Sequence, residues 1–274
     1  MHAMLLNGSL IDLSKPIVMG ILNVTPDSFF DGGQYSTSEQ ITQRALQIKN
    51  EGAAIIDIGA YSSRPGARDI SAKEEIERLI PALETVRNVL PDFPISIDTF
   101  RSKVVEAVFK HLGGIIVNDI SGGELDKEMI HVVGHHKLPY ICMHMRGTPQ
   151  TMQNDTHYEN LINEIIDYFS FKIRTFHQAG INDVIIDPGF GFSKTIAQNF
   201  ELLHKLEYLR FLDTPVLVGL SRKSMIWKTL GIEPSEALNG TTALNMVALQ
   251  KAAKILRVHD VCEAVQTIRL FNEL

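Results

Sequence analysis

The sequence predicts a (β/α)8 barrel, a closed sheet of eight parallel strands joined by helices. The first observation is the regular alternation of eight short apolar runs with eight segments in which apolar residues recur every three or four positions. Such alternation indicates parallel strands with helical crossovers. The second is the length of 274 residues, which suits a barrel of about 250 residues. A doubly wound open sheet is the alternative architecture.

The expected strands are short runs rich in Ile, Val, Leu and Met. They are Ile17–Leu22, Ala54–Ile58, Pro94–Ile97, Gly114–Val117, Pro139–Met143, Val184–Ile186, Pro215–Gly219 and Ile255–Val258. The expected helical segments are Thr37–Asn50, Ala72–Val89, Arg101–Lys110, Lys127–His135, Tyr158–Ala179, Ala197–Tyr208, Arg222–Gln250 and Asp260–Asn272. The seventh is expected to break near Gly231–Pro234, because Gly and Pro interrupt helices.

A β-hairpin is expected before the first barrel strand. Asn7-Gly8 separates two short apolar runs, and this dipeptide is typical of a two-residue hairpin turn. The hairpin is expected to cover one end of the barrel. Since no linker, low-complexity tract or composition shift divides the chain, residues 1–274 are expected to form a single domain.

Composition excludes several classes of partner. The net charge is −6 and no basic run is present, so nucleic acid is not expected as a partner. Cys142 and Cys262 lie in apolar surroundings without metal-ligand spacing, which favours a reducing cytoplasm. No stretch has the length and apolarity of a membrane span or a signal peptide. The sequence therefore predicts a cytoplasmic protein.

Polar side chains follow every expected strand. Active sites of this barrel lie at the carboxyl ends of its strands. The residues found there are Asn23, Asp57 with Ser62 to Arg64, Asp98, Asn118, His144, Asp187, Ser221 to Lys223, and His259. A structural barrel needs some polar loop residues, but repeated Asp and Asn at the last strand position indicate a binding site.

Residues 184–195 read V-I-I-D-P-G-F-G-F-S-K-T, an apolar strand that ends at Asp187. The loop that follows carries aromatic residues, including Phe192, and the cation Lys194. A carboxylate beside aromatic faces and a cation suits a flat, polar, nitrogen-rich ligand. The alternative is that Asp187 only caps the next helix.

Asp98 and Asn118 end two further strands, although Asp and Asn are depleted inside strands. A carboxylate accepts two parallel N–H bonds from an amidine-like edge, such as that of a 2-amino-4-oxo-pyrimidine ring. An Asn adds a donor and an acceptor for the other side of the ring. We therefore expect these side chains to converge with Asp187 on one ligand. The alternative for Asp98 is an N-cap of the following helix.

Two loops are rich in groups that bind ions. Residues 23–33 read N-V-T-P-D-S-F-F-D-G-G, and Asn23 is a candidate contact for a magnesium–phosphate group. Residues 62–66 read S-S-R-P-G, where hydroxyls beside Arg64 suit a carboxylate or a phosphate. Ordinary turn chemistry is the alternative for both loops.

Cations also follow the last two strands. The sequence G-L-S-R-K-S opens a helix, and its Arg222 and Lys223 oppose the helix dipole, so both are expected to contact a ligand. Arg257 and His259 alternate along the final strand. Next to Asn23 in a closed barrel, they form a candidate anion pocket. A surface Arg and a capping His are the alternative for this pair.

Eight stretches resemble one known family over nearly the whole chain. In order they are M-G-I-L-N-V-T-P-D-S-F, S-S-R-P-G-A, I-D-T-F-R, V-N-D-I-S-G-G, M-H-M-R-G-T-P-Q-T-M-Q, I-I-D-P-G-F-G-F-S-K, V-G-L-S-R-K-S and R-V-H-D. Together they resemble the dihydropteroate synthases. The resemblance implies a (β/α)8 barrel that joins 6-hydroxymethyl-7,8-dihydropterin pyrophosphate to 4-aminobenzoate, releasing 7,8-dihydropteroate and pyrophosphate in folate biosynthesis. It also implies a need for Mg²⁺, inhibition by sulfonamides that mimic 4-aminobenzoate, and a homodimer formed by helices of the C-terminal half.

The resemblance implies three pockets. The pterin would contact Asp98, Asn118, Met143, Asp187, Phe192 and Lys223. The pyrophosphate would contact Asn23, Arg64, Arg257 and His259, with Asn23 also a magnesium ligand. The 4-aminobenzoate would lie near Ser63, Pro65, Phe192, Lys223 and Ser224. The implied catalytic residues are Asp98, Asp187, Lys223 and Asn23.

The chain departs from the family at two positions of the second loop. Tyr61 stands where many members have Glu, and Ser63 where Thr is common. Loop closure and sulfonamide affinity are therefore the properties that the resemblance implies least firmly for this chain. A pterin-binding methyltransferase would share the Asp and Asn set but would not need the S-R-K-S or T-P-D-S-F segments. A non-catalytic paralogue would be expected to lack residues such as Asn23 or Lys223, and the chain retains them.

Overall fold

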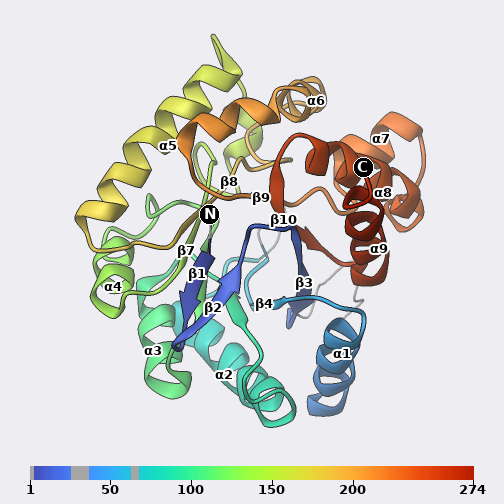
Figure 1. The fold of residues 1–274 in the computed structure, drawn as a ribbon. Coiled ribbons are helices and arrows are strands. Elements are labelled where there is room, and N and C mark those ends of the chain that lie inside the picture. The colour runs from blue at the N-terminus through green and yellow to red at the C-terminus, as the bar shows by residue number, and fades with distance from the viewer. Residues whose placement is uncertain (1–2, 26–36, 63–67) are drawn as a thin grey trace.

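Parallel strands close into a barrel in the computed structural model, which describes residues 3–25, 37–62 and 68–274. Within these residues the barrel has eight strands in the order β10-β3-β4-β5-β6-β7-β8-β9. Helices surround it (Figure 1). The predicted (β/α)8 architecture is confirmed, and the open sheet is excluded because β10 pairs with both β9 and β3.

Each expected strand is present, and several extend to the polar residue that follows the apolar run. The strands are β3 (Ile17–Asn23), β4 (Ile55–Gly59), β5 (Ile95–Asp98), β6 (Ile116–Asp119), β7 (Tyr140–Met143), β8 (Val184–Asp187), β9 (Val216–Val218) and β10 (Ala253–Val258). Asn23, Asp98 and Asp187 are therefore the last residues of their strands.

The expected helices are also found, with small shifts at their ends. They are α1 (Ser38–Asn50), α2 (Ala72–Val89), α3 (Ser102–Leu112), α4 (Met129–His136), α5 (Leu161–Gln178), α6 (Ile196–His204), α7 (Ser224–Leu230), α8 (Leu238–Gln250) and α9 (Val261–Phe271). Short 3-10 helices cover Met152–Asn154, Leu206–Leu212 and Pro234–Glu236. The last of these separates α7 from α8, at the predicted break.

Side-chain caps explain several helix boundaries. The Thr37 side chain accepts a hydrogen bond from the backbone of Gln40, whose side chain in turn accepts from the backbone of Thr37, so α1 begins with a capping box. Asn160 caps α5 in the same position, which is why this helix begins later than predicted. Gly231 ends α7 with φ of 67°, a left-handed conformation that Gly adopts without steric cost.

The predicted hairpin covers the N-terminal end of the barrel (Figure 1). It pairs β1 (Ala3–Leu6) with β2 (Ser9–Asp12). Positive φ angles at Asn7 and Gly8 are those that a type I′ turn requires. The side chains of Met4, Leu6 and Leu13 are buried in one cluster with inward-facing residues of the barrel: Met19, Ile55, Ile116, Ile141, Ile185, Leu217 and Ile255. The hairpin thus closes the end of the barrel opposite to the carboxyl ends of the strands.

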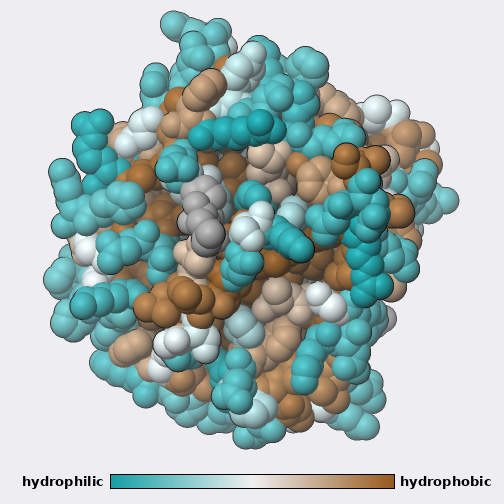
Figure 2. All heavy atoms as spheres, viewed as in Figure 1, coloured by the Kyte–Doolittle hydropathy of each residue, from teal (hydrophilic) through white to brown (hydrophobic). Residues whose placement is uncertain are grey.

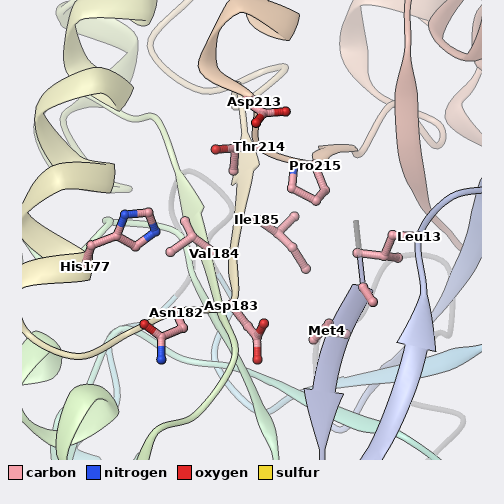
Figure 3. A pocket seen from close by; sticks show the side chains of 11 residues that line it. Met4, Leu13, His177, Asn182, Asp183, Val184, Ile185, Asp213, Thr214 and Pro215 are labelled. Atoms are coloured by element: carbon pink, nitrogen blue, oxygen red, sulfur yellow. The ribbon is translucent and has the colours of Figure 1, made fainter. Parts of the chain in front are cut away.

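A pocket of about 210 Å³ lies at this N-terminal end. Figure 3 shows Met4 and Leu13 on one side of it, and residues at the starts of β8 and β9 on the other. Figure 2 shows mainly hydrophilic side chains around the edge of the same face, with hydrophobic ones nearer the middle. Because strands begin here, this pocket is separate from the strand ends that carry the predicted site.

Candidate functional site

The carboxyl ends of β4, β5, β6 and β10 share one network of polar side chains. The Arg257 Nε donates to Asp57 Oδ2 over 2.6 Å, and its Nη2 lies 2.6 Å from Asp98 Oδ2. The Asn118 Nδ2 donates to the same Asp57 oxygen over 3.1 Å. The structure therefore brings Asp98 and Asn118 together through Asp57 and Arg257.

Strand register explains why these side chains meet. Asn23 pairs with Gly59, Gly59 with Asp98, and Asp98 with Asn118, so the four lie at one level of the barrel. A Cβ on Gly59 would lie 3.2 Å from the Cβ of Asp98 and 3.5 Å from Oδ1 of Asn23. The absence of a side chain at Gly59 leaves Asn23 and Asp98 next to each other.

Asp187 and Lys223 extend the site on the side of β8. Asp187 is 6% exposed, and its Oδ1 accepts a 2.8 Å hydrogen bond from the backbone of Gly189. The charge of Lys223 interacts with those of Asp187, Asp98 and Arg257. The acidic and basic groups therefore belong to one cluster rather than to separate regions.

Burial sets the protonation of this cluster. Burial raises the pKa of Asp98 to about 7; Arg257 opposes the shift, and Asp57 adds to it. It also raises the pKa of Asp187, against the opposing effect of Lys223. Burial lowers the pKa of Lys223 to about 8, which Asp187 opposes. Asp98 thus keeps its proton to higher pH than an exposed aspartate does.

Apolar side chains form a wall beside the charged cluster. Met143 is 3% exposed and is buried with three neighbours, Ile120, Met145 and Met152. The rings of Phe100 and Phe192 pack against them. The Lys223 Nζ lies 4.7 Å from the centre of the Phe192 ring, within cation–π range. A flat ligand would meet both apolar faces and hydrogen-bonding groups here.

His259 directly follows the last strand, and hydrogen bonds of its backbone hold it in place. Its N–H donates to Ser221 Oγ over 3.2 Å, and its carbonyl accepts from Arg44 Nη2 over 2.6 Å. Burial, helped by the charge of Arg257, lowers the pKa of His259 to about 3. The imidazole is therefore neutral in the free protein, and Arg257 is the cation of the predicted anion pocket.

Of the two cations before α7, only Lys223 is directed to the site. Arg222 has φ of 54° and its guanidinium pairs with both carboxylate oxygens of Asp260 at 2.8 Å. It also donates to the carbonyl oxygen of Ser235 over 2.5 Å. These partners occupy its guanidinium, and the expectation that Arg222 contacts a ligand stays a prediction. Ser224 is the first residue of α7 and is half-buried.

Part of the predicted site lies outside the described residues. This applies to Ser63, Arg64 and Pro65, and to the first loop beyond Thr25. Tyr61, just before the second loop, packs edge-on against Phe100 with ring centres 4.9 Å apart. Its hydroxyl accepts a 3.0 Å hydrogen bond from Gln150.

Two features of the site were not predicted. Asp57 is one of the predicted strand-end residues, but no role was predicted for it. The signal was present, because a charged residue inside the apolar sequence I-I-D-I-G indicates a buried partner. The second feature is the burial of Met145 and Met152 beside Met143, which was harder to predict. These two residues lie in a loop and a 3-10 helix, where no periodicity indicates which side chains face inward.

Among the residues that the structure describes, no three His, Cys, Asp or Glu side chains gather in a way that could hold a metal ion. None of the helices there combines the length and apolarity needed to cross a membrane.

Comparisons with known proteins agree with this geometry. Residues 19–259 match the family described as pterin binding enzyme. The chain is 45% identical over 263 residues to a dihydropteroate synthase of Synechocystis sp., which spans 95% of this chain and 90% of that protein. The structure of a dihydropteroate synthase of Yersinia pestis, solved as a sulfonamide drug complex, superposes with a TM-score of 0.94 at 37% identity. The superposition covers 99% of this chain and 98% of the Yersinia chain. One from Xanthomonas albilineans with 4-aminobenzoic acid has a TM-score of 0.89 at 36% identity, covering 99% and 97%.

Proposed function

Because this chain belongs to the dihydropteroate synthase family of pterin binding enzymes, we propose that it condenses 6-hydroxymethyl-7,8-dihydropterin pyrophosphate with 4-aminobenzoate. The products are 7,8-dihydropteroate and pyrophosphate, in folate biosynthesis. The observation that carries the proposal is the single cluster of Asp57, Asp98, Asn118 and Arg257, which Asp187 and Lys223 extend. Its mixture of carboxylates, an amide and cations suits a pterin that carries an anionic leaving group.

Asp98, Asn118 and Asp187 hold the pterin in this proposal. The carboxylates accept N–H bonds from the amidine-like edge, and the Asn118 amide offers a donor and an acceptor. Met143 and Phe192 contact the faces of the ring. Lys223 donates to the ring from the side of Phe192, to which its ammonium lies close.

The pyrophosphate would lie near Asn23, Arg257 and His259. Arg257 is 22% exposed, so its guanidinium has room for an anion beside its two carboxylate partners. His259 is neutral and contributes a hydrogen bond rather than charge. The resemblance adds Arg64 of the second loop.

The residues present suit a magnesium ion that keeps most of its ligands as water and phosphate oxygens. Asn23 beside Asp98 supplies an amide oxygen at the rim, and the described residues offer no closed set of carboxylate ligands. When bound, the ion would offset the charge of the leaving pyrophosphate.

Loss of pyrophosphate places positive charge on the pterin methylene. The carboxylate of Asp187 is buried and that of Asp98 is half-buried. In their ionised forms they stabilise a developing cation beside them more strongly than they would in water. The amine of 4-aminobenzoate then attacks the methylene carbon. Phe192, Lys223 and Ser224, with Ser63 and Pro65, would position the arylamine. Because an aromatic amine is a weak base, its proton leaves without a strong general base.

A pyrophosphate-release assay tests the proposed function. The purified protein is mixed with Mg²⁺ and the pterin pyrophosphate, with and without 4-aminobenzoate. We expect release that depends on the arylamine, competitive inhibition by a sulfonamide, and a large loss in Asp98→Asn. Asp167→Asn, an exposed carboxylate change on α5, serves as the matched control. If no pyrophosphate is released, or if its release does not depend on 4-aminobenzoate, the proposal is contradicted.

Exposed leucines on the C-terminal helices support a homodimer. Leu230 of α7 is 55% exposed, Leu270 of α9 is 65% exposed, and Leu274 is 88% exposed. Figure 1 places α7, α8 and α9 side by side. We expect the wild type to sediment as a dimer and Leu270→Lys to sediment as a monomer.

Cys142 and Cys262 are both free thiols rather than partners in a disulfide. This supports the proposal that the protein functions in the reducing cytoplasm.

A further inference from the structure

A buried lysine that takes no part in the proposed reaction lies near the end of the loop after β8. Lys194 is 4% exposed. Its Nζ lies 3.1 Å from each of three acceptors: His144 Nδ1, the Gly189 carbonyl oxygen and the Phe192 carbonyl oxygen. An ammonium has three donors, so each has a partner. Burying a lysine costs free energy unless its charge is well hydrogen-bonded, which indicates that this arrangement serves a purpose.

His144 is suited to accept a hydrogen bond from Lys194. It follows β7, is 3% exposed, and its ring meets that of Tyr168 edge-on with centres 4.9 Å apart. Burial, together with the charge of Lys194, lowers the pKa of His144 well below its usual value. The imidazole is therefore neutral, and its Nδ1 accepts while Lys194 donates.

The loop held by Lys194 also carries the groups that face the substrate. The backbone of Gly189 donates to the Asp187 carboxylate, and the Phe190 carbonyl accepts from Lys223 Nζ. The Phe192 ring lies beside the same ammonium. Lys194 thus donates to two carbonyls of this short loop, and Lys223, the lysine of the site, donates to a third.

The approach of this loop to β7 is close. Gly189 has φ of 71°, and a Cβ at this position would lie 2.1 Å from the carbonyl oxygen of His144. The His144 backbone also donates to the Asp187 carbonyl over 2.9 Å. The backbone of His144 is therefore in direct contact with Asp187 and with the start of the loop.

We propose that Lys194 and His144 form a positioning pair, whose hydrogen bond fixes the loop that presents Asp187, Phe192 and Lys223 to the pterin. The proposal rests on the proposed function and adds two residues that do not touch substrate. Its physical basis is the three-acceptor contact of Lys194. Removal of the ammonium takes the Lys194 donor from the Phe192 carbonyl and leaves the Gly189 carbonyl with the Phe192 N–H alone.

The experiment compares Lys194→Met with Lys172→Met. Lys172 is a matched control, since it is also buried and donates to a loop carbonyl, that of Gly122, over 2.9 Å. Its hydrogen bonds go to Gly122 and Glu124, which follow β6 rather than β8. We expect both variants to melt at lower temperature than the wild type. Well below melting, only Lys194→Met should raise the pterin dissociation constant, by about tenfold or more, and speed amide hydrogen exchange in residues 189–193.

A second pair of variants tests the same contact from the other side. His144→Leu removes the acceptor and should reproduce the loss of pterin affinity, whereas His144→Gln keeps an acceptor and should restore most of it. Wild-type pterin affinity in folded Lys194→Met, or equal losses in His144→Leu and His144→Gln, would overturn the proposal. If the wild type itself binds no pterin, the proposed function fails, while the exchange rates of residues 189–193 still decide whether Lys194 fixes the loop.

Discussion

Replacing Asp57 by Asn tests how the charged cluster is built. Asp57 is fully buried, and its Oδ2 accepts from both Arg257 and Asn118. Its Oδ1 is buried and has no hydrogen-bond partner among the described residues. An Asn side chain keeps one acceptor but removes the charge, and it must place an NH2 group where no acceptor is present.

The expected loss of unfolding free energy in Asp57→Asn follows from these contacts. Turning the charge-assisted bond to Arg257 into a neutral one loses about 1 kcal/mol, and a buried NH2 without an acceptor costs about 1–3 kcal/mol. The sum, about 2–4 kcal/mol, corresponds to a fall in melting temperature of roughly 4–16 °C at about 2–4 °C per kcal/mol. Arg257 keeps Asp98 as a partner, which limits the loss.

The same change alters the titration of Asp98. The negative charge of Asp57 contributes to the raised pKa of Asp98, about 7 in the wild type. Without it, Asp98 remains a carboxylate to lower pH, so the midpoint below which pterin affinity falls should move to more acidic pH. Thermal unfolding and calorimetric titration across neutral pH measure both effects, with Asp167→Asn as the control. A wild-type melting temperature together with an unchanged midpoint would refute this account of the cluster.

Three further variants test other contacts. Asp187→Asn should abolish pterin binding, because its NH2 would face the donors of the ring; unchanged affinity by calorimetry would refute this assignment. Gly189→Ala should lower the unfolding free energy by at least about 2 kcal/mol, because φ is 71° and its Cβ would lie 2.1 Å from a carbonyl oxygen; a wild-type melting curve would contradict it. Arg222→Met should cost about 3 kcal/mol by breaking the pair with Asp260, whose partners are 11% and 18% exposed. Chemical denaturation that shows no loss would exclude a stabilising role for that pair.

The fold was predictable because local and long-range requirements agree in this chain. Short apolar runs bounded by polar residues favour buried strands, and the segments between them have helical periodicity. Asn7-Gly8 specified the hairpin because both residues accept positive φ. The location of the site followed from the barrel itself, since Asp98, Asn118 and Asp187 lie at the carboxyl ends of parallel strands, at one rim.

The direction of individual side chains was less predictable. Arg222 and Lys223 are adjacent cations, and the sequence alone does not distinguish which one turns inward. The left-handed backbone at Arg222 and the carboxylate of Asp260 decide it. Likewise, Lys194 and His144 are fifty residues apart, and their contact follows from the closed sheet rather than from any local pattern.

A crystal structure of the protein with a bound pterin tests the central claim most directly. We predict a ring between Met143 and Phe192, with its amidine-like edge on Asp187, its other polar groups within hydrogen-bonding distance of Asp98 and Asn118, and Lys223 at its side. A pterin bound in the pocket under the N-terminal hairpin, or at the rim without contact to these carboxylates, would contradict the site described above.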